Sequence, residues 1–186
     1  MPRKIRTDSE LKEAASHVKY EIEMLTHCTE YLSAEYASPP DPLAAPDKNM
    51  ALETFLLHYR NLRAFLCPNL QRVAEDDIIA SDFLKETSAR DIADASKFKL
   101  DKERLDGMLS HLTYRRVDYI AAGNNFWSVS DMLRTMLLEL QAFIGTLPPA
   151  MASWFPALSV LIPPSWTTVH TIPGPGVVTT QASKKD

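Results

Sequence analysis

Apolar residues recur at steps of three and four positions through four long segments, and this period constrains the fold more than any other feature. An α-helix has 3.6 residues per turn, so such a period gathers the apolar side chains on one helix face. The pattern predicts amphipathic helices over residues 8–35, 49–66, 100–122 and 128–147. Prolines follow the first, second and fourth of these segments, where they prevent a helix from continuing.

Polar residues near two of the expected helix starts suggest how those helices begin. Thr7 and Glu10 have the spacing of a capping box, in which a hydroxyl and a carboxylate satisfy backbone N–H groups reciprocally. The aspartates at 76–77 are expected to cap a short helix over residues 78–85. Within that helix, Ile79 is expected to point inward, together with Phe83 one turn later.

Local residue types predict the structure of two connections between the helices. The stretch 86–97 has no clear period and is predicted to be a loop. Gly123 stands where a left-handed helix cap is needed, and residues 124–127 are expected to form a turn. Ser128 or Ser130 is then expected to cap the last long helix.

Together these elements predict an all-α fold, a four-to-five-helix up-and-down bundle with a proline-rich C-terminal extension. A chain of 186 residues, 45% hydrophobic, is long enough to bury a core as one domain. Five glycines are few for a turn-rich barrel or sandwich. The bundle is assigned to residues 1–147. Residues 148–186 are expected to pack on it and end in a flexible tail, with strand-like alternation over 166–172.

Charge and cysteine content limit the partners and the compartment. The net charge of −4 gives no whole-molecule attraction to nucleic acid or to an anionic membrane. Cys28 and Cys67 do not make a disulfide framework, and no apolar run reaches the length of a membrane-spanning helix. We therefore expect a cytoplasmic protein with no membrane association.

Most catalytic motifs are missing from the sequence. The histidines show neither the HExxH pattern nor the paired Glu-x-x-His motifs of di-iron bundles, so we expect no metal. There is no Gly-x-Ser-x-Gly elbow and no glycine-rich phosphate loop, and we expect no cofactor. Isolated surface or boundary histidines are the simplest interpretation of these residues.

One pair in the third long helix could act on RNA. Arg104 and His111 are seven residues apart, which places them within roughly 20° on one face and about 10.5 Å apart along the axis. Residues 97–116 carry six Lys or Arg against three Asp or Glu, and Arg115 and Arg116 would add to a patch that attracts phosphates. Histidine can exchange protons with a 2′-hydroxyl while arginine stabilises phosphate charge. Alternatively, the histidine is a boundary residue and the two later arginines form a solvated face.

Three segments resemble a known family. Residues 51–66 (ALETFLLHYRNLRAFL), 76–83 (DDIIASDF) and 110–116 (SHLTYRR) are similar to small uncharacterised bacterial HEPN-like proteins, over roughly residues 49–120. The resemblance implies a helical bundle that is commonly dimeric. Many members are metal-independent endoribonucleases of toxin–antitoxin or phage-defence systems, and others are non-catalytic binding modules.

The family signature is an arginine, four to six residues, then a histidine. By this resemblance His111 would be the acid/base residue and Arg104 would stabilise the phosphate, with two such pairs meeting across a dimer interface. Leu105 departs from the polar residue usual after the arginine. His58 and Arg60 on the second helix are expected to line the same cleft.

Two functions therefore remain open. The first is an RNA-cleaving HEPN-like homodimer with an antitoxin-like protein partner. The second is a non-catalytic helical interaction or dimerisation module. Its contact surface would come from residues 154–156 and from Met132 and Met136, which could equally be ordinary core and lid packing.

Overall fold

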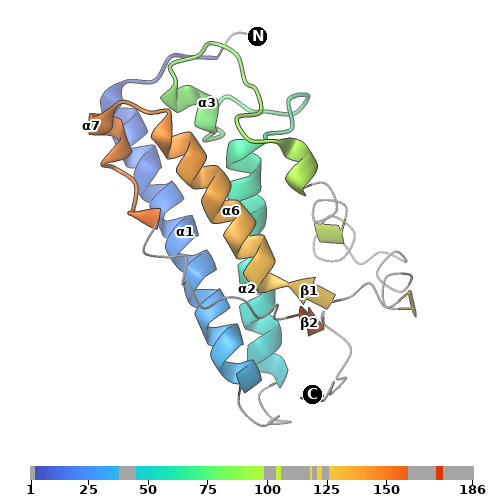
Figure 1. Ribbon diagram of the computed structural model, residues 1–186. Coiled ribbons are helices and arrows are strands. Elements are labelled where there is room, and N and C mark those ends of the chain that lie inside the picture. Colours follow the sequence, from blue (N-terminus) through green and yellow to red (C-terminus); the bar gives the residue numbers. More distant parts are fainter. Residues whose placement is uncertain are drawn as a thin grey trace.

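Three long helices dominate the structure, a computed structural model that describes residues 3–37, 45–98, 104–105, 118, 121–122, 126–158 and 171–173. They are α1 (Asp8–Ala37), α2 (Ala45–Leu66) and α6 (Val129–Gly145) (Figure 1). Shorter elements are α3 (Ala80–Phe83), the 3₁₀ helix η2 (Ala95–Phe98), α7 (Pro149–Ala152) and the strands β1 (Phe126–Ser128) and β2 (Thr171–Pro173).

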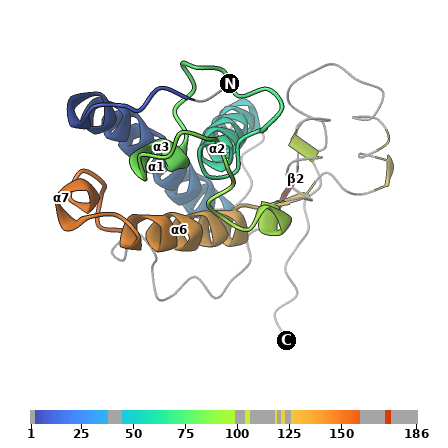
Figure 2. The ribbon, with the colours of Figure 1, turned by 90° about the horizontal axis from the view of Figure 1, so that it is seen from above.

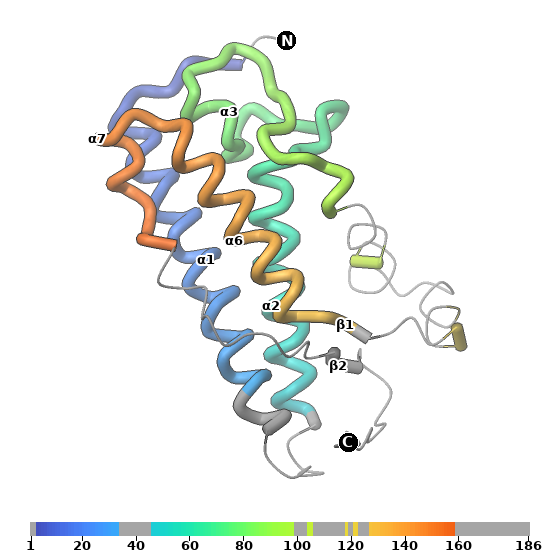
Figure 3. Tube along the Cα trace, in the orientation of Figure 1, coloured from blue at the N-terminus to red at the C-terminus, as the bar shows by residue number. Residues whose placement is uncertain are grey.

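The long helices form a bundle of the predicted all-α class. Helix α2 returns antiparallel beside α1, and α6 lies against one side of this pair (Figure 2). The tube in Figure 3 shows that α2 and α6 both run toward the end of the molecule where α1 begins. The pairing leaves one side of α1 and α2 facing away from α6.

The buried face of each long helix follows the predicted apolar period. The core residues recur at three- and four-residue steps, as the apolar period predicts. Met50 is an exception, since the same period in 49–66 places it on the apolar face but its side chain is 60% exposed. Fully buried examples are Leu11, Ala15, Ile22, Leu25 and Leu32 in α1, Leu52, Phe55, Tyr59 and Leu66 in α2, and Leu133, Met136, Leu137 and Leu140 in α6.

The capping box at the start of α1 is present. The backbone N–H of Thr7 donates to Glu10 Oε2 at 2.8 Å, and the N–H of Glu10 donates to Thr7 Oγ1 at 3.3 Å. The predicted cap at 76–77 is wrong, because α3 begins after Ile79 and has no side-chain cap. Asp77 instead accepts the N–H of Ala74 at 2.7 Å, closing a turn before the helix.

The start of α6 also differs from the prediction. Ser128 is the residue before the helix, but its hydroxyl donates to Asp131 Oδ2 at 2.7 Å and caps no backbone N–H. Residues 126–127, expected in a turn, form part of β1, which pairs antiparallel with β2 so that Trp127 faces Ile172. The predicted cap Gly123 lies outside the described residues.

The third predicted helix is described only at a few positions. Arg104, Leu105, Asp118 and Ala121 are helical, Ala122 lies in a turn, and the other residues of 100–122 lie outside the described part. The stretch 86–97, predicted as a loop, is irregular through Asp94 and then enters the 3₁₀ helix η2.

The chain after α6 packs onto the bundle through residue 158. Four phenylalanine rings from α2, α3, α6 and the segment after α7 meet with centroids 5.4 to 6.1 Å apart: Phe65, Phe83, Phe143 and Phe155. The contacts are edge to face except the one between Phe83 and Phe155, which is tilted at 59°. Met151 and Leu158 are buried beside this cluster. The predicted tail after residue 173 lies outside the described residues.

None of the helices in the described part of the chain combines the length and apolar character needed to span a bilayer.

Candidate functional site

Arg104 is the only member of the predicted Arg104–His111 pair that lies within the described residues. Its guanidinium carbon stands 4.0 Å from the centroid of the Trp127 ring, a cation–π contact. Trp127 belongs to β1 and is fully buried. The next residue, Leu105, is also buried in the core. The contact therefore joins Arg104, near the start of the third predicted helix, to β1, the strand that precedes α6.

His111, Arg115 and Arg116 lie outside the described residues. The assignment of an acid/base role to His111, and of RNA-phosphate binding to the two arginines, stays a prediction.

His58 is a buried residue that connects α2 to α1. Its Nδ1 lies 2.7 Å from Glu21 Oε2, and the same oxygen accepts a hydrogen bond from Asn61 Nδ2 at 3.0 Å. The ring of Tyr20 stands edge-on to the imidazole, with centroids 5.7 Å apart. These contacts hold α1 and α2 in one register, with Glu21 level with His58.

Arg60 lies on a different side of α2 from His58. Two residues correspond to about 200° of rotation, and Arg60 is exposed while His58 is buried. The structure thus brings His58 to Glu21 on α1 and does not bring it to Arg60. Because His111 lies outside the described residues, the cleft that His58 and Arg60 were expected to line with it stays a prediction.

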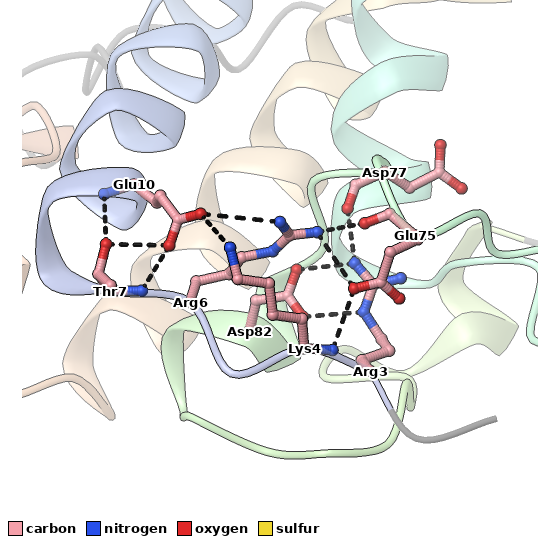
Figure 4. Close-up of polar contacts among 8 residues, drawn as sticks. All are labelled: Arg3, Lys4, Arg6, Thr7, Glu10, Glu75, Asp77 and Asp82. Carbon is pink, nitrogen blue, oxygen red and sulfur yellow. Dashed lines mark hydrogen bonds and ion pairs between the residues drawn. The ribbon is translucent and has the colours of Figure 1, made fainter.

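A dense polar cluster lies where the N-terminal segment meets the connection between α2 and α3 (Figure 4). The buried guanidinium of Arg3 donates to both carboxylate oxygens of Asp82, each at 3.0 Å. It also donates to the backbone oxygens of Ala74 and Asp77, each at 2.7 Å. Sequence reasoning missed this cluster, since 79 residues separate Arg3 from Asp82 and no motif links them.

Two hollows of about 300 Å³ each flank the connection between α2 and α3. The first lies beside the Arg3 cluster and is lined largely by ionisable side chains: Arg6, Glu10, Glu13, His17, Asp76, Asp77 and Asp82. The second is mostly uncharged and is lined in part by Asn61, Ala64, Phe65, Val73 and Ile78. Among the described residues, no group of three or more His, Cys, Asp or Glu side chains could hold a metal ion.

The outer face of α2 carries a stripe of uncharged side chains, all exposed except Thr54, which is partly exposed. We define the α2 stripe as Met50, Thr54, Leu57, Asn61 and Ala64. The side chain of Met50 is 60% exposed and that of Leu57 is 49% exposed, although both belong to a helix whose opposite face forms the core. On the adjoining part of α1, Tyr20 is 52% exposed. Several large apolar side chains on neighbouring helices therefore remain in contact with solvent.

Comparisons with known protein families, with curated proteins and with solved structures give no match. The resemblance to HEPN-like proteins accordingly stays a prediction.

Proposed function

We propose that this protein is a non-catalytic helical module that forms a homodimer through the outer face of α2. The observation that carries the proposal is the α2 stripe, in which Met50, Leu57 and Ala64 recur every seven residues on the side of α2 away from the core. Scattered exposed apolar residues are ordinary, but a regular row along one helix is typical of a helix–helix contact.

The contacts of the described candidate residues favour a structural role over a catalytic one. The guanidinium of Arg104 lies against the buried Trp127 ring, and His58 is buried against Glu21. Both arrangements stabilise the bundle by joining segments that are distant in sequence. A residue that holds the fold together in this way is less available to bind a phosphate or to exchange a proton with a substrate.

The oligomeric state of the full chain tests the proposal. Light scattering and sedimentation velocity over a wide concentration range should give a mass twice that of the 20.9 kDa chain, with dissociation on dilution. Leu57→Glu should return the protein to a monomer, because it places a charge in the centre of the contact. Leu138→Glu is the matched control, since Leu138 is 47% exposed on α6 and lies outside the proposed contact. A wild-type chain that remains monomeric throughout would refute the proposal.

A cleavage assay separates this proposal from the ribonuclease hypothesis. Single-stranded RNA incubated with the protein in the presence of a chelator should remain intact. Cleavage by the wild type that yields 2′,3′-cyclic phosphate ends and disappears in His111→Ala would instead support the ribonuclease function.

A further inference from the structure

We infer that α2 packs antiparallel against α2 of a second copy of this chain, about a two-fold axis near Leu57, and that Glu53 and Arg60 fix this arrangement. The inference rests on the proposed homodimer and adds its register and its specificity. Three features of the described residues support it independently: the spacing of the stripe, the charges beside it and the hollow at one end of it.

The spacing of the stripe suits a two-helix seam. Its members, from Met50 to Ala64, follow one another at alternating steps of four and three residues, the spacing of the contact positions of a coiled coil. Leu57 is the midpoint of the row. A two-fold axis through it places Leu57 opposite Leu57 of the partner subunit, and Met50 opposite the partner's Ala64.

The charges beside the stripe complement each other only in the antiparallel arrangement. Glu53 and Arg60 are exposed on the same flank of the stripe and are nearly equidistant from Leu57. A two-fold axis there brings Glu53 opposite the partner's Arg60 and Arg60 opposite the partner's Glu53, which gives two ion pairs. In a parallel pair, Glu53 would instead face the other flank, where His58 is buried against Glu21 of its own chain.

The hollow beside Ala64 complements the side chain of Met50. This is the second hollow described above, of about 300 Å³, and Ala64, Phe65 and Ile78 form part of its wall. Under the proposed axis, the partner's Met50 stands at its mouth. An exposed methionine is long, unbranched and adaptable, and suits an irregular recess of mixed lining, in which Arg72 and Asp77 stand beside the apolar side chains. Met50 therefore lies at one end of the stripe and the hollow at the other. An antiparallel pair brings a Met50 side chain to a hollow at both ends of the contact.

Helix α1 extends the same contact. Because the Glu21–His58 hydrogen bond sets the level of α1 against α2, the axis near Leu57 passes close to the level of Ile22. Tyr20 would then lie opposite the partner's Met24, two residues on either side of that level. Tyr20 is 52% exposed and Met24 is partly exposed, and a thioether beside an aromatic ring is a favourable contact. The two α1–α2 pairs would thus form an intermolecular four-helix layer.

Charge reversal tests the ionic part of the inference. Glu53→Arg and Arg60→Glu each create two like-charge contacts per dimer, and each should raise the dissociation constant about tenfold or more. The double variant carrying both changes restores the opposite charges and should recover wild-type affinity. An equimolar mixture of the two single variants should likewise form a heterodimer. Arg134→Glu, at an exposed position of α6, is the control and should change nothing.

Cysteine cross-linking tests the register without relying on affinity. The native thiols, Cys28 and Cys67, are buried and should not compete. Leu57→Cys should form a disulfide with itself under mild oxidation, because a residue on the axis meets its own copy. Met50→Cys should not, since its two copies would stand about 21 Å apart along the helix axis. Rapid self-cross-linking of Met50→Cys would indicate a parallel pair and overturn the inference.

The outcomes separate this inference from the proposed function. A dimer that is lost in Leu57→Glu but unaffected by either charge reversal would keep the proposed function and reject the antiparallel register. A wild-type monomer would reject both. Circular dichroism of each variant shows that a loss of dimer is not a loss of fold.

Discussion

Arg3 and Asp82 form the most deeply buried ion pair among the described residues, with side chains only 6% and 5% exposed. Removing one partner of such a pair leaves an uncompensated charge in the interior, which costs roughly 3–5 kcal/mol. Arg3→Leu should therefore lower the free energy of unfolding by about that amount in a denaturant titration. Two further hydrogen bonds from the guanidinium to Ala74 and Asp77 are lost in the same variant.

The exposed ion pair between Lys85 and Asp8 is the control for that measurement. It is short, at 2.8 Å, and also joins residues far apart in sequence, but both side chains are largely exposed. Lys85→Ala should therefore cost about 1 kcal/mol or less. If Arg3→Leu and Lys85→Ala lowered the free energy of unfolding equally, burial would not explain the strength of the Arg3–Asp82 pair.

Glu10 makes the start of α1 sensitive to acid. A hydrogen bond from Lys4, together with those from the backbone and hydroxyl of Thr7, lowers the pKa of Glu10 to about 2 from its ordinary value of 4.5. The ionised form is thus favoured by the folded state, so the stability it contributes is fully present above pH 4.5. This contribution is lost as the pH falls through about 2.

An NMR titration of the Glu10 carboxyl should accordingly show a midpoint near pH 2. The difference in unfolding free energy between the wild type and Glu10→Gln should be constant at neutral pH and shrink as the solution is acidified. A carboxyl that titrates near its ordinary pKa, or a difference that does not depend on pH, would exclude this account.

The contacts of individual residues can be predicted from the sequence only where the two partners are a few positions apart. Thr7 and Glu10 are three positions apart, so the spacing itself specifies the contact. Asp82 and Trp127 find their partners, Arg3 and Arg104, 79 and 23 residues away, and such contacts depend on how the helices pack. The same limit applies to His58, whose bond to Glu21 follows from the α1–α2 register and not from any motif.

At the scale of elements, the long helices were predictable because their apolar period extends over many turns. The short elements were not. β1 exists because β2 lies beside it, and the paired residues Trp127 and Ile172 are 45 positions apart. The expected turn at 124–127 came from local polarity alone, which carries no information about a distant partner strand. The α2 stripe was overlooked because the core of α2 already accounts for a broad apolar face, and the exposure of Leu57 is visible only once the helices are packed.

The phenylalanine cluster makes α6 the element that connects α2 and α3 to the segment after α7. Phe143 of α6 contacts Phe65, Phe83 and Phe155, which come from three other segments. Phe143→Ala should lower the free energy of unfolding by roughly 3–5 kcal/mol, because it removes a buried ring and leaves a cavity. Leu138→Ala, on the exposed face of the same helix, should change it by only about 0.5 kcal/mol.

Thermal or urea unfolding of the two variants provides the comparison. If Phe143→Ala lowered the free energy of unfolding only slightly, the phenylalanine cluster would not be what holds the segment after α7 on the bundle. Alanine has the highest helix propensity, so neither substitution weakens the helix itself, and a larger loss of unfolding free energy in Phe143→Ala reports packing.

At the scale of the whole molecule, the core is continuous. One cluster of buried side chains includes residues of α1, α2, α3 and α6 and extends to Met151, Phe155 and Leu158 beyond the predicted bundle boundary at residue 147. Secondary elements that share one core generally unfold together. The segment 148–158 is therefore expected to unfold with the helices and not before them.

The two cysteines provide a test of this cooperativity. Cys28 lies in α1 and Cys67 follows α2, and both are buried. Burial raises the pKa of both thiols, to about 11 for Cys67. Since the thiolate is the reactive form, neither should react with a thiol reagent at pH 8 in the folded protein. Single variants, Cys28→Ala and Cys67→Ala, let each thiol be followed alone. Both should become reactive at the same urea concentration, the one at which circular dichroism reports unfolding. Labelling of Cys67 well before Cys28 would show that the end of α2 opens independently, and the bundle would then not be a single cooperative unit.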